Sequence, residues 1–216
     1  MKLICYSLFF SLCQFAVAQD TLNFDSIEYK VRAIGNNPAR YYYQNRPFSG
    51  VIVKGNLTNP SEIFSVKHGK MHGWYSSYYA NGSTKVSEHY EFGRRDGESK
   101  RWYENGELQN KMMYEQGELR DTVWAWYPNG QLKKMSIEQP FEKYTLESSL
   151  WYANGQLQYR ATANYQESYF ENGQLRVKGV LRNHKCDGKF KYYNEDGKLE
   201  KIIIWKNGKE KKVIQK

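Results

Sequence analysis

Cysteine is scarce in this sequence of 216 residues. Only Cys5, Cys13 and Cys186 occur, and the first two lie in an N-terminal stretch that we expect to be removed. A single remaining cysteine cannot form an internal disulfide, so we expect strand pairing and packing to hold the fold together. Cys186 is more typical of a half-buried small residue in a turn than of a reactive thiol.

The sequence also lacks an apolar run of about 20 residues, the length that a membrane-spanning helix requires. Its longest apolar stretch, Leu3 to Val17, follows Lys2 and ends at Ala16-Val17-Ala18. This layout is typical of a secretory signal peptide, and it favours cleavage before Gln19 over an uncleaved anchor. We therefore expect residues 1–18 to be removed and the mature chain to act in the periplasm, at the cell surface or outside the cell.

Catalytic motifs are missing as well. There is no Gly-x-Ser-x-Gly elbow, phosphate loop or dinucleotide fingerprint. His68 and His72 are four residues apart, but they flank a predicted glycine turn and not a helix face. Acidic residues such as Glu104 and Glu107 lie in or beside turns, where side chains are usually solvated. We predict no catalytic, cofactor or metal site, and hence no enzyme activity.

One motif recurs along the chain: two aromatic residues, any residue, then Asn-Gly. Its copies are Tyr78-Tyr79-Ala80-Asn81-Gly82, Trp102-Tyr103-Glu104-Asn105-Gly106, Trp126-Tyr127-Pro128-Asn129-Gly130, Trp151-Tyr152-Ala153-Asn154-Gly155 and Tyr169-Phe170-Glu171-Asn172-Gly173, with a looser copy at Tyr192-Tyr193-Asn194-Glu195-Asp196-Gly197. The steps between these glycines are 24, 24, 25, 18 and 24 residues. A period in this range indicates a repeat architecture.

Each copy predicts a β-hairpin. Asn-Gly is the strongest short hairpin signal, and we expect a type I′ turn at each copy. A second turn follows 11 residues later, as Gly93 follows Gly82, and a further glycine stands nine residues before the Asn-Gly glycine, a position that Asp121 fills in one copy. The predicted fold is all-β: an elongated antiparallel meander of β-hairpins with a repeat of about 24 residues, forming an open, twisted sheet.

The pattern is uneven. The 18-residue step predicts a shortened strand or turn between Ala161 and Tyr165, and the missing glycine turn predicts a bulge or kink within Gln139 to Ser148. Residues 19–45 are expected to form an N-terminal leader or cap. Residues 46–216 are expected to form a single array that begins with a strand over Arg46 to Val53 and ends in a basic C-terminal tail.

These motifs resemble MORN-type repeats in their bacterial variant form. The resemblance rests on the aromatic-aromatic-x-Asn-Gly core, on Gly69-Lys70-Met71-His72-Gly73-Trp74 and on Phe92-Gly93-Arg94-Arg95-Asp96-Gly97, and it covers the chain from Arg46 onwards. It implies an elongated hairpin sheet that serves as a scaffold or as a membrane-associated interaction module. Some bacterial relatives carry an antitoxin-family label, but an export signal argues against a partner inside the cell.

Two features suggest binding surfaces. The first aromatic residues of the copies, which are Tyr78, Trp102, Trp126, Trp151 and Tyr169, should form a row on one face of the sheet, where they either hold the array together or bind a ligand. The formal charge is +9, and much of the excess lies in Lys206, Lys209, Lys211, Lys212 and Lys216. The glycines of the recurring motif are assigned as structural turn residues; they are Gly82, Gly106, Gly130, Gly155, Gly173 and Gly197.

The sequence thus favours an exported, non-enzymatic interaction or structural scaffold with another protein as its partner. The alternatives are a binder of anionic lipid surfaces or glycans, and an antitoxin-like protein. No cofactor and no nucleic-acid partner are expected, and the oligomeric state stays open.

Overall fold

The computed structural model describes residues 21–26, 28–30, 39–138 and 147–216. The expected signal peptide and the segment 139–146 lie outside these ranges. The only helical element among the described residues is a single turn of 3-10 helix, η1 (Phe24–Ser26). No helix in this part of the chain is long and apolar enough to cross a membrane. Aromatic and β-branched residues between tight turns favour strands, and the all-β prediction is confirmed.

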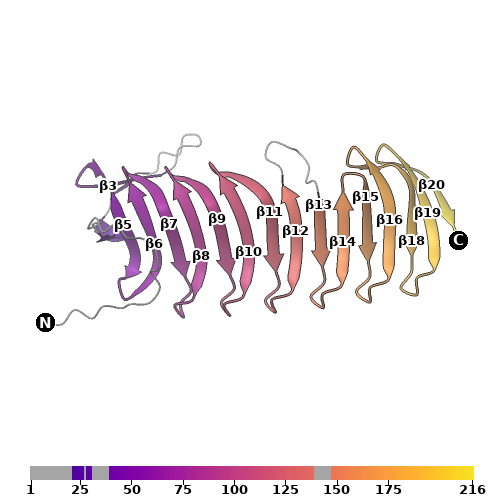
Figure 1. The fold of residues 1–216 in the computed structure, drawn as a ribbon, viewed down its shortest axis with the longest axis horizontal. Coiled ribbons are helices and arrows are strands. Elements are labelled where there is room, and N and C mark those ends of the chain that lie inside the picture. Colours follow the sequence, from indigo (N-terminus) through magenta and orange to yellow (C-terminus); the bar gives the residue numbers. More distant parts are fainter. Residues whose placement is uncertain (1–20, 27, 31–38, 139–146) are drawn as a thin grey trace.

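Most of the described chain forms one long, open sheet of consecutive hairpins, which runs from β5 near the N-terminus to β20 at the C-terminus (Figure 1). Its strands are β5 (Gly50–Asn56), β6 (Asn59–Lys67), β7 (Lys70–Tyr78), β8 (Thr84–Glu91), β9 (Arg94–Trp102), β10 (Leu108–Glu115), β11 (Glu118–Trp126), β12 (Leu132–Glu138), β13 (Glu147–Trp151), β14 (Leu157–Thr162), β15 (Tyr165–Tyr169), β16 (Leu175–Arg182), β17 (Lys185–Cys186), β18 (Gly188–Tyr193), β19 (Leu199–Lys206) and β20 (Lys209–Gln215).

Pairing follows chain order and is antiparallel from β5 onwards, with β18 beside β16 and the two-residue β17 paired to the end of β16. The N-terminal edge of the sheet is covered by β1 (Thr21–Asn23), which runs parallel to β5. A separate small sheet contains β2 (Glu28–Lys30), β3 (Arg40–Tyr43) and β4 (Arg46–Pro47). The described part of residues 19–45 therefore includes a strand that caps the array.

The hydrophobic core sits at the N-terminal end, where β3 packs against β5, β6 and β7. Its buried members are Tyr41, Phe48, Ile52, Phe64 and Val66. A smaller buried site near the C-terminus holds Phe190, and a Cβ atom at Gly179 would overlap its ring. Between these ends the described array is thin, as expected for a chain with a mean hydropathy of −0.84.

The register defines two faces. Tyr75, Glu88 and Ser99 pair across β7, β8 and β9, and we call their side the tyrosine face. Ser76, Ser87 and Lys100 are one residue along and project from the opposite side, because successive residues of a strand alternate. That side also carries Trp74, Trp102, Trp124, Trp126 and Trp151, and we call it the tryptophan face.

The 18-residue step is explained by a short hairpin. β14 and β15 have six and five residues, whereas β9 and β11 have nine, which confirms the predicted shortening. The predicted bulge within 139–148 falls mainly outside the described residues. On either side of it, β12 and β13 pair without a register shift from Lys134↔Leu150 to Ile137↔Glu147.

Candidate functional site

The first aromatic residue of each motif ends a strand on the tryptophan face. Tyr78, Trp102, Trp126, Trp151 and Tyr169 are all half-buried. Four of them oppose a leucine on the next strand, as in the pair Trp102↔Leu108, and Tyr78 opposes Thr84. The row that the sequence predicts is therefore present, and it occupies the same side of successive hairpins. Cross-strand pairs of this kind stabilise a sheet.

The second aromatic residue joins one hairpin to the next. The Tyr79 hydroxyl donates to the backbone carbonyl of Trp102 at 2.8 Å, and Tyr103 and Tyr127 make the same bond to Trp126 and Trp151 at 2.9 Å. Tyr152 donates to the carbonyl of Tyr169 at 3.0 Å. The tyrosine at this position therefore links adjacent units, which sequence spacing alone did not reveal.

The motif asparagine has two roles. Its Oδ1 accepts the backbone N–H two residues later, as Asn105 does from Glu107 at 3.1 Å. Its Nδ2 donates to a carbonyl of the following unit, as Asn105 does to Pro128 at 2.8 Å. The same donation is made by Asn81, Asn129, Asn154 and Asn172. The asparagines thus form a second line of links, parallel to the tyrosine hydroxyls.

The predicted type I′ conformation at the Asn-Gly positions is wrong. Gly106 has φ 87°, but Asn105 is not among the described residues with positive φ, and the Gly106 N–H donates to the Tyr103 carbonyl. This pattern fits a type I turn followed by a left-handed glycine. Positive φ at both central residues occurs instead in the second turn of the repeat, as at Phe92-Gly93 and Gln116-Gly117. The motif glycines are therefore turn residues with positive φ, but in a turn of a different type from the one predicted.

The turns at the opposite end of the hairpins are also tied to their neighbours. The Gly93 N–H donates to the Met71 carbonyl and the Gly117 N–H to the Arg95 carbonyl, both at 2.7 Å. The Asp96 carboxylate accepts the Gln116 N–H at 3.0 Å. Each hairpin that makes these bonds is therefore fixed to its neighbour at both ends.

Asp121 takes over the backbone role of the glycine it replaces. Gly73 and Gly97 have φ 96° and 104°, and Asp121 has φ 61°. All three lie where several residues of one strand oppose a single residue of its neighbour, which is a bulge in the pairing. Aspartate tolerates left-handed backbone better than most residues. The irregular sequence at this position therefore leaves the array intact.

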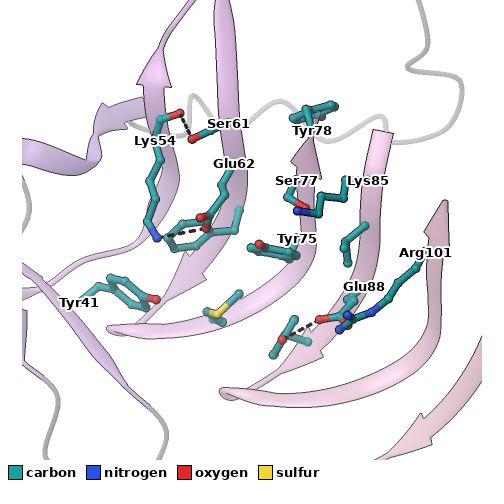
Figure 2. Close-up of a pocket in the computed structure, with 14 residues that line it drawn as sticks. Tyr41, Lys54, Ser61, Glu62, Tyr75, Ser77, Tyr78, Lys85, Glu88 and Arg101 are labelled. Carbon is teal, nitrogen blue, oxygen red and sulfur yellow. Dashed lines mark hydrogen bonds and ion pairs between the residues drawn. The ribbon is translucent and has the colours of Figure 1, made fainter. Parts of the chain in front are cut away.

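The tyrosine face is hollowed near its N-terminal end. A cavity of 590 Å³ is lined by side chains that include Tyr41, Glu62, Tyr75, Glu88 and Arg101 (Figure 2). Glu88 is only 5% exposed. Its carboxylate accepts hydrogen bonds from the Tyr90 hydroxyl at 2.8 Å and from Ser99 at 3.1 Å. The guanidinium groups of Arg95 and Arg101 lie 3.8 Å from Oε1.

Burial and the neighbouring Glu88 carboxylate hold the pKa of the Tyr90 phenol well above its usual value. Burial also raises the pKa of Tyr75, and the carboxylates of Glu62 and Glu88 add to this effect. Both phenols therefore stay neutral hydrogen-bond donors near neutral pH. A buried carboxylate with hydroxyl donors and two cations nearby is chiefly a structural group. Sequence analysis missed Glu88, because it stands in an ordinary alternating strand.

The histidine side chains in the described part of the chain do not form a metal site. Among the described residues, no group of three or more His, Cys, Asp and Glu side chains could hold a metal ion. His89 Nδ1 lies 2.8 Å from the Asp96 carbonyl, and its ring packs edge-on against Trp74. The ring of His72 lies 5.1 Å from that of Phe92.

The basic C-terminal segment forms the last hairpin of the sheet, β19 and β20. Residues 175–216 contain 13 Lys and Arg and five Asp and Glu, so they account for +8 of the formal charge of +9. Lys178, Lys189 and Lys191 are exposed on the tryptophan face of β16 and β18. The positive charge is therefore displayed on a regular surface.

Comparison with known proteins agrees with this architecture. The family model described as MORN repeat variant matches residues 95–116, 164–183 and 187–207. No curated protein matches the chain at a significant level. Each matched segment spans the two strands on either side of a motif turn, as 95–116 spans β9 and β10. The chain therefore contains MORN-variant repeats, and each matched repeat is one hairpin of the sheet.

Proposed function

We propose that this protein is an exported, non-enzymatic scaffold that binds another protein along its sheet. MORN repeats are generally interaction or structural modules and are typically non-enzymatic. The observation that carries the proposal is the double line of links between units, made by the tyrosine hydroxyls and the asparagine amides. These bonds hold successive hairpins in a fixed order, so the sheet offers two extended faces of constant geometry to a partner.

Export is tested by the mass of the mature protein. The protein should be isolated from the native host with a C-terminal tag and analysed by intact-mass spectrometry. We expect loss of residues 1–18, because Ala16-Val17-Ala18 has the form of a cleavage site. A mass that still includes these residues would contradict the proposed processing.

The scaffold role is tested by photo-crosslinking in cells. A photoreactive amino acid is placed at Met113 on the tryptophan face, at Arg101 on the tyrosine face, or at Leu57 in the exposed turn between β5 and β6. These positions are 39% exposed for Met113 and 65% for Leu57, and the Arg101 side chain is 48% exposed. We expect a discrete protein adduct from one of the two faces and none from Leu57. Absence of an adduct from both faces would contradict the proposal.

The C-terminal charge supports a second candidate, binding to an anionic lipid surface. Lys178, Lys189 and Lys191 are exposed beside Val180, which is 56% exposed. Surface charges attract an anionic membrane and are screened by salt. The protein should sediment with vesicles rich in phosphatidylglycerol but not with phosphatidylcholine alone, and high salt or the triple change to Glu should release it. Equal sedimentation with both vesicle types would argue against this candidate.

A further inference from the structure

A groove on the tryptophan face differs chemically from the rest of that face. It lies over β7, β8 and β9 and has a volume of 660 Å³. The rings of Trp74, Tyr78 and Trp102 line it, together with hydroxyl groups that include those of Ser76, Thr84 and Ser87. None of the residues that line it is charged. Aromatic walls with a few polar groups between them are typical of small-molecule sites.

The register of the hairpin builds this groove. Ser76 pairs with Ser87 across β7 and β8, so two small hydroxylated side chains lie next to each other as the floor. Trp74 and Tyr78 stand two residues before and after Ser76, on the same face. Trp74 is 57% exposed. The hydrogen bond from Tyr79 to the Trp102 carbonyl fixes the next hairpin, which carries the third ring.

The other hairpins of the described array differ from this one at the floor of the groove. At the positions equivalent to Ser76 and Ser87, their paired residues are Lys100↔Lys111, Trp124↔Met135, Ser149↔Arg160, Glu167↔Lys178 and Lys191↔Ile202. Every one of these pairs includes at least one long side chain. On β9 and β10, the ammonium groups of Lys100 and Lys111 both pair with Glu98 above the sheet. Two serines leave this space open.

We propose that the groove over β7, β8 and β9 binds a neutral oligosaccharide. A pyranose ring has an apolar C–H face that packs on an aromatic ring, and its rim carries hydroxyl groups. Serine and threonine hydroxyls both donate and accept hydrogen bonds, so they match such a rim. The hydroxyls of Ser76, Thr84 and Ser87 make no side-chain hydrogen bond to another described residue, and they are free to pair with a ligand. An uncharged lining disfavours an ionic ligand, because the groove offers no opposite charge to pair with a charged group that the ligand would bury there.

A proline-rich peptide is the main competitor, since aromatic grooves also dock such segments. Proline residues have no N–H group, so a run of them offers carbonyl acceptors only. The floor of hydroxyls is used more fully by a ligand that both donates and accepts, which a sugar does. The inference extends beyond the scaffold role, and it requires neither export nor a protein partner.

The test is isothermal titration calorimetry on the protein purified from expression of the full chain. The ligands are the neutral hexasaccharides of the cellulose, chitin and starch series, and a decamer of proline. We expect heat of binding with at least one hexasaccharide and none with the decamer. Failure of all three sugars to bind, or binding of the proline decamer in their place, would overturn the proposal. Neither result would affect the crosslinking test of the scaffold role.

Three variants localise the site. Trp74→Ala removes an exposed ring and should raise the Kd at least about tenfold, as for an aromatic hot spot. Ser87→Lys introduces into the groove the residue type found at the equivalent position of the next hairpin, Lys111. This change should abolish binding. Phe92→Ala is the matched control, because Phe92 is 53% exposed but lies outside the groove. Melting curves confirm that each variant folds. An unchanged Kd in Trp74→Ala, or an equal loss in Phe92→Ala, would refute the assignment.

Discussion

The change Tyr103→Phe tests the link between neighbouring hairpins most directly. The ring stays in place, and only the 2.9 Å hydrogen bond from the hydroxyl to the Trp126 carbonyl is lost. A neutral hydrogen bond contributes about 0.5–1.5 kcal/mol, and a half-buried carbonyl regains only part of its hydration. We therefore expect a loss of about 1 kcal/mol in unfolding free energy. For a chain of this length, that lowers the Tm by about 2–4 °C.

The chain supplies two matched controls. Tyr78→Phe removes a hydroxyl from the neighbouring copy of the motif, where no hydrogen bond to another described residue is formed, and it should leave stability within about 0.5 kcal/mol of the wild type. Phe170 occupies the linking position without a hydroxyl. Phe170→Tyr should therefore add a bond to the Tyr193 carbonyl and raise stability by up to about 1 kcal/mol.

The assay is urea denaturation followed by tryptophan fluorescence and far-UV circular dichroism. Tyr79, Tyr103 and Tyr127 lie two strands apart, which is about 10 Å, so their effects should add. The triple Tyr→Phe protein should lose about 3 kcal/mol. If Tyr103→Phe and Tyr78→Phe unfold at the same urea concentration, the hydroxyl bond does not stabilise the array and the reasoning is refuted.

Five further substitutions, at Glu104, Gly106, Asp121 and Trp126, address the turns and the aromatic row. Gly106→Val should lower the unfolding free energy by about 1–3 kcal/mol through backbone strain alone, because φ is 87° and a Cβ atom there would meet nothing within 4 Å. Glu104→Ala, in the same exposed turn, should change it by no more than about 0.5 kcal/mol. Equal denaturation midpoints for the two variants would contradict the turn assignment. Asp121→Val should cost about 1–2 kcal/mol, whereas Asp121→Gly should be neutral within about 0.5 kcal/mol, since only the valine resists the left-handed backbone; chemical denaturation distinguishes them. Trp126→Ala should cost about 3 kcal/mol, at the lower end for an aromatic residue because this ring is half-buried, and calorimetry should show the two halves of the sheet melting separately; an unchanged profile would instead favour a binding role for the row.

The fold could be predicted because its signals are local. Asn-Gly pairs, the paired aromatic residues before them and the spacing of the glycines mark turns that each hairpin forms within its own sequence. The turn type was mispredicted for the same reason. Asn105-Gly106 suits a type I′ turn in isolation, but the Asn105 side chain is engaged in bonds to Glu107 and to the next unit.

The last copy shows how contacts between units set the phase of a repeat. Its sequence suggests the aromatic pair Tyr192-Tyr193, yet Tyr193 opposes Leu199 as Trp102 opposes Leu108. Asn194 therefore stands where the other copies have their second aromatic residue, and its N–H donates to the Lys198 carbonyl. This shift of the motif by one residue could be recognised only from the pairing of the strands.

The candidate grooves were beyond sequence analysis, since each is assembled from residues that no motif connects. Tyr78 and Trp102 were predicted as members of a row, but Trp74 and the floor serines lie outside the recurring aromatic-aromatic-x-Asn-Gly motif. Their significance comes from the residues that replace them in other hairpins, such as Lys100 and Lys111. Comparing equivalent positions within one chain is thus more informative than the motif itself.

The direction of pairing has a mechanical consequence. Interstrand hydrogen bonds run perpendicular to the strands and therefore along the length of the sheet. A force that pulls the two ends apart loads these bonds one strand at a time, like a zipper and not in shear. Each ruptured unit of 24 residues would release about 80 Å of chain. Anchored at both ends, such a protein would yield stepwise under tension and absorb extension one hairpin at a time.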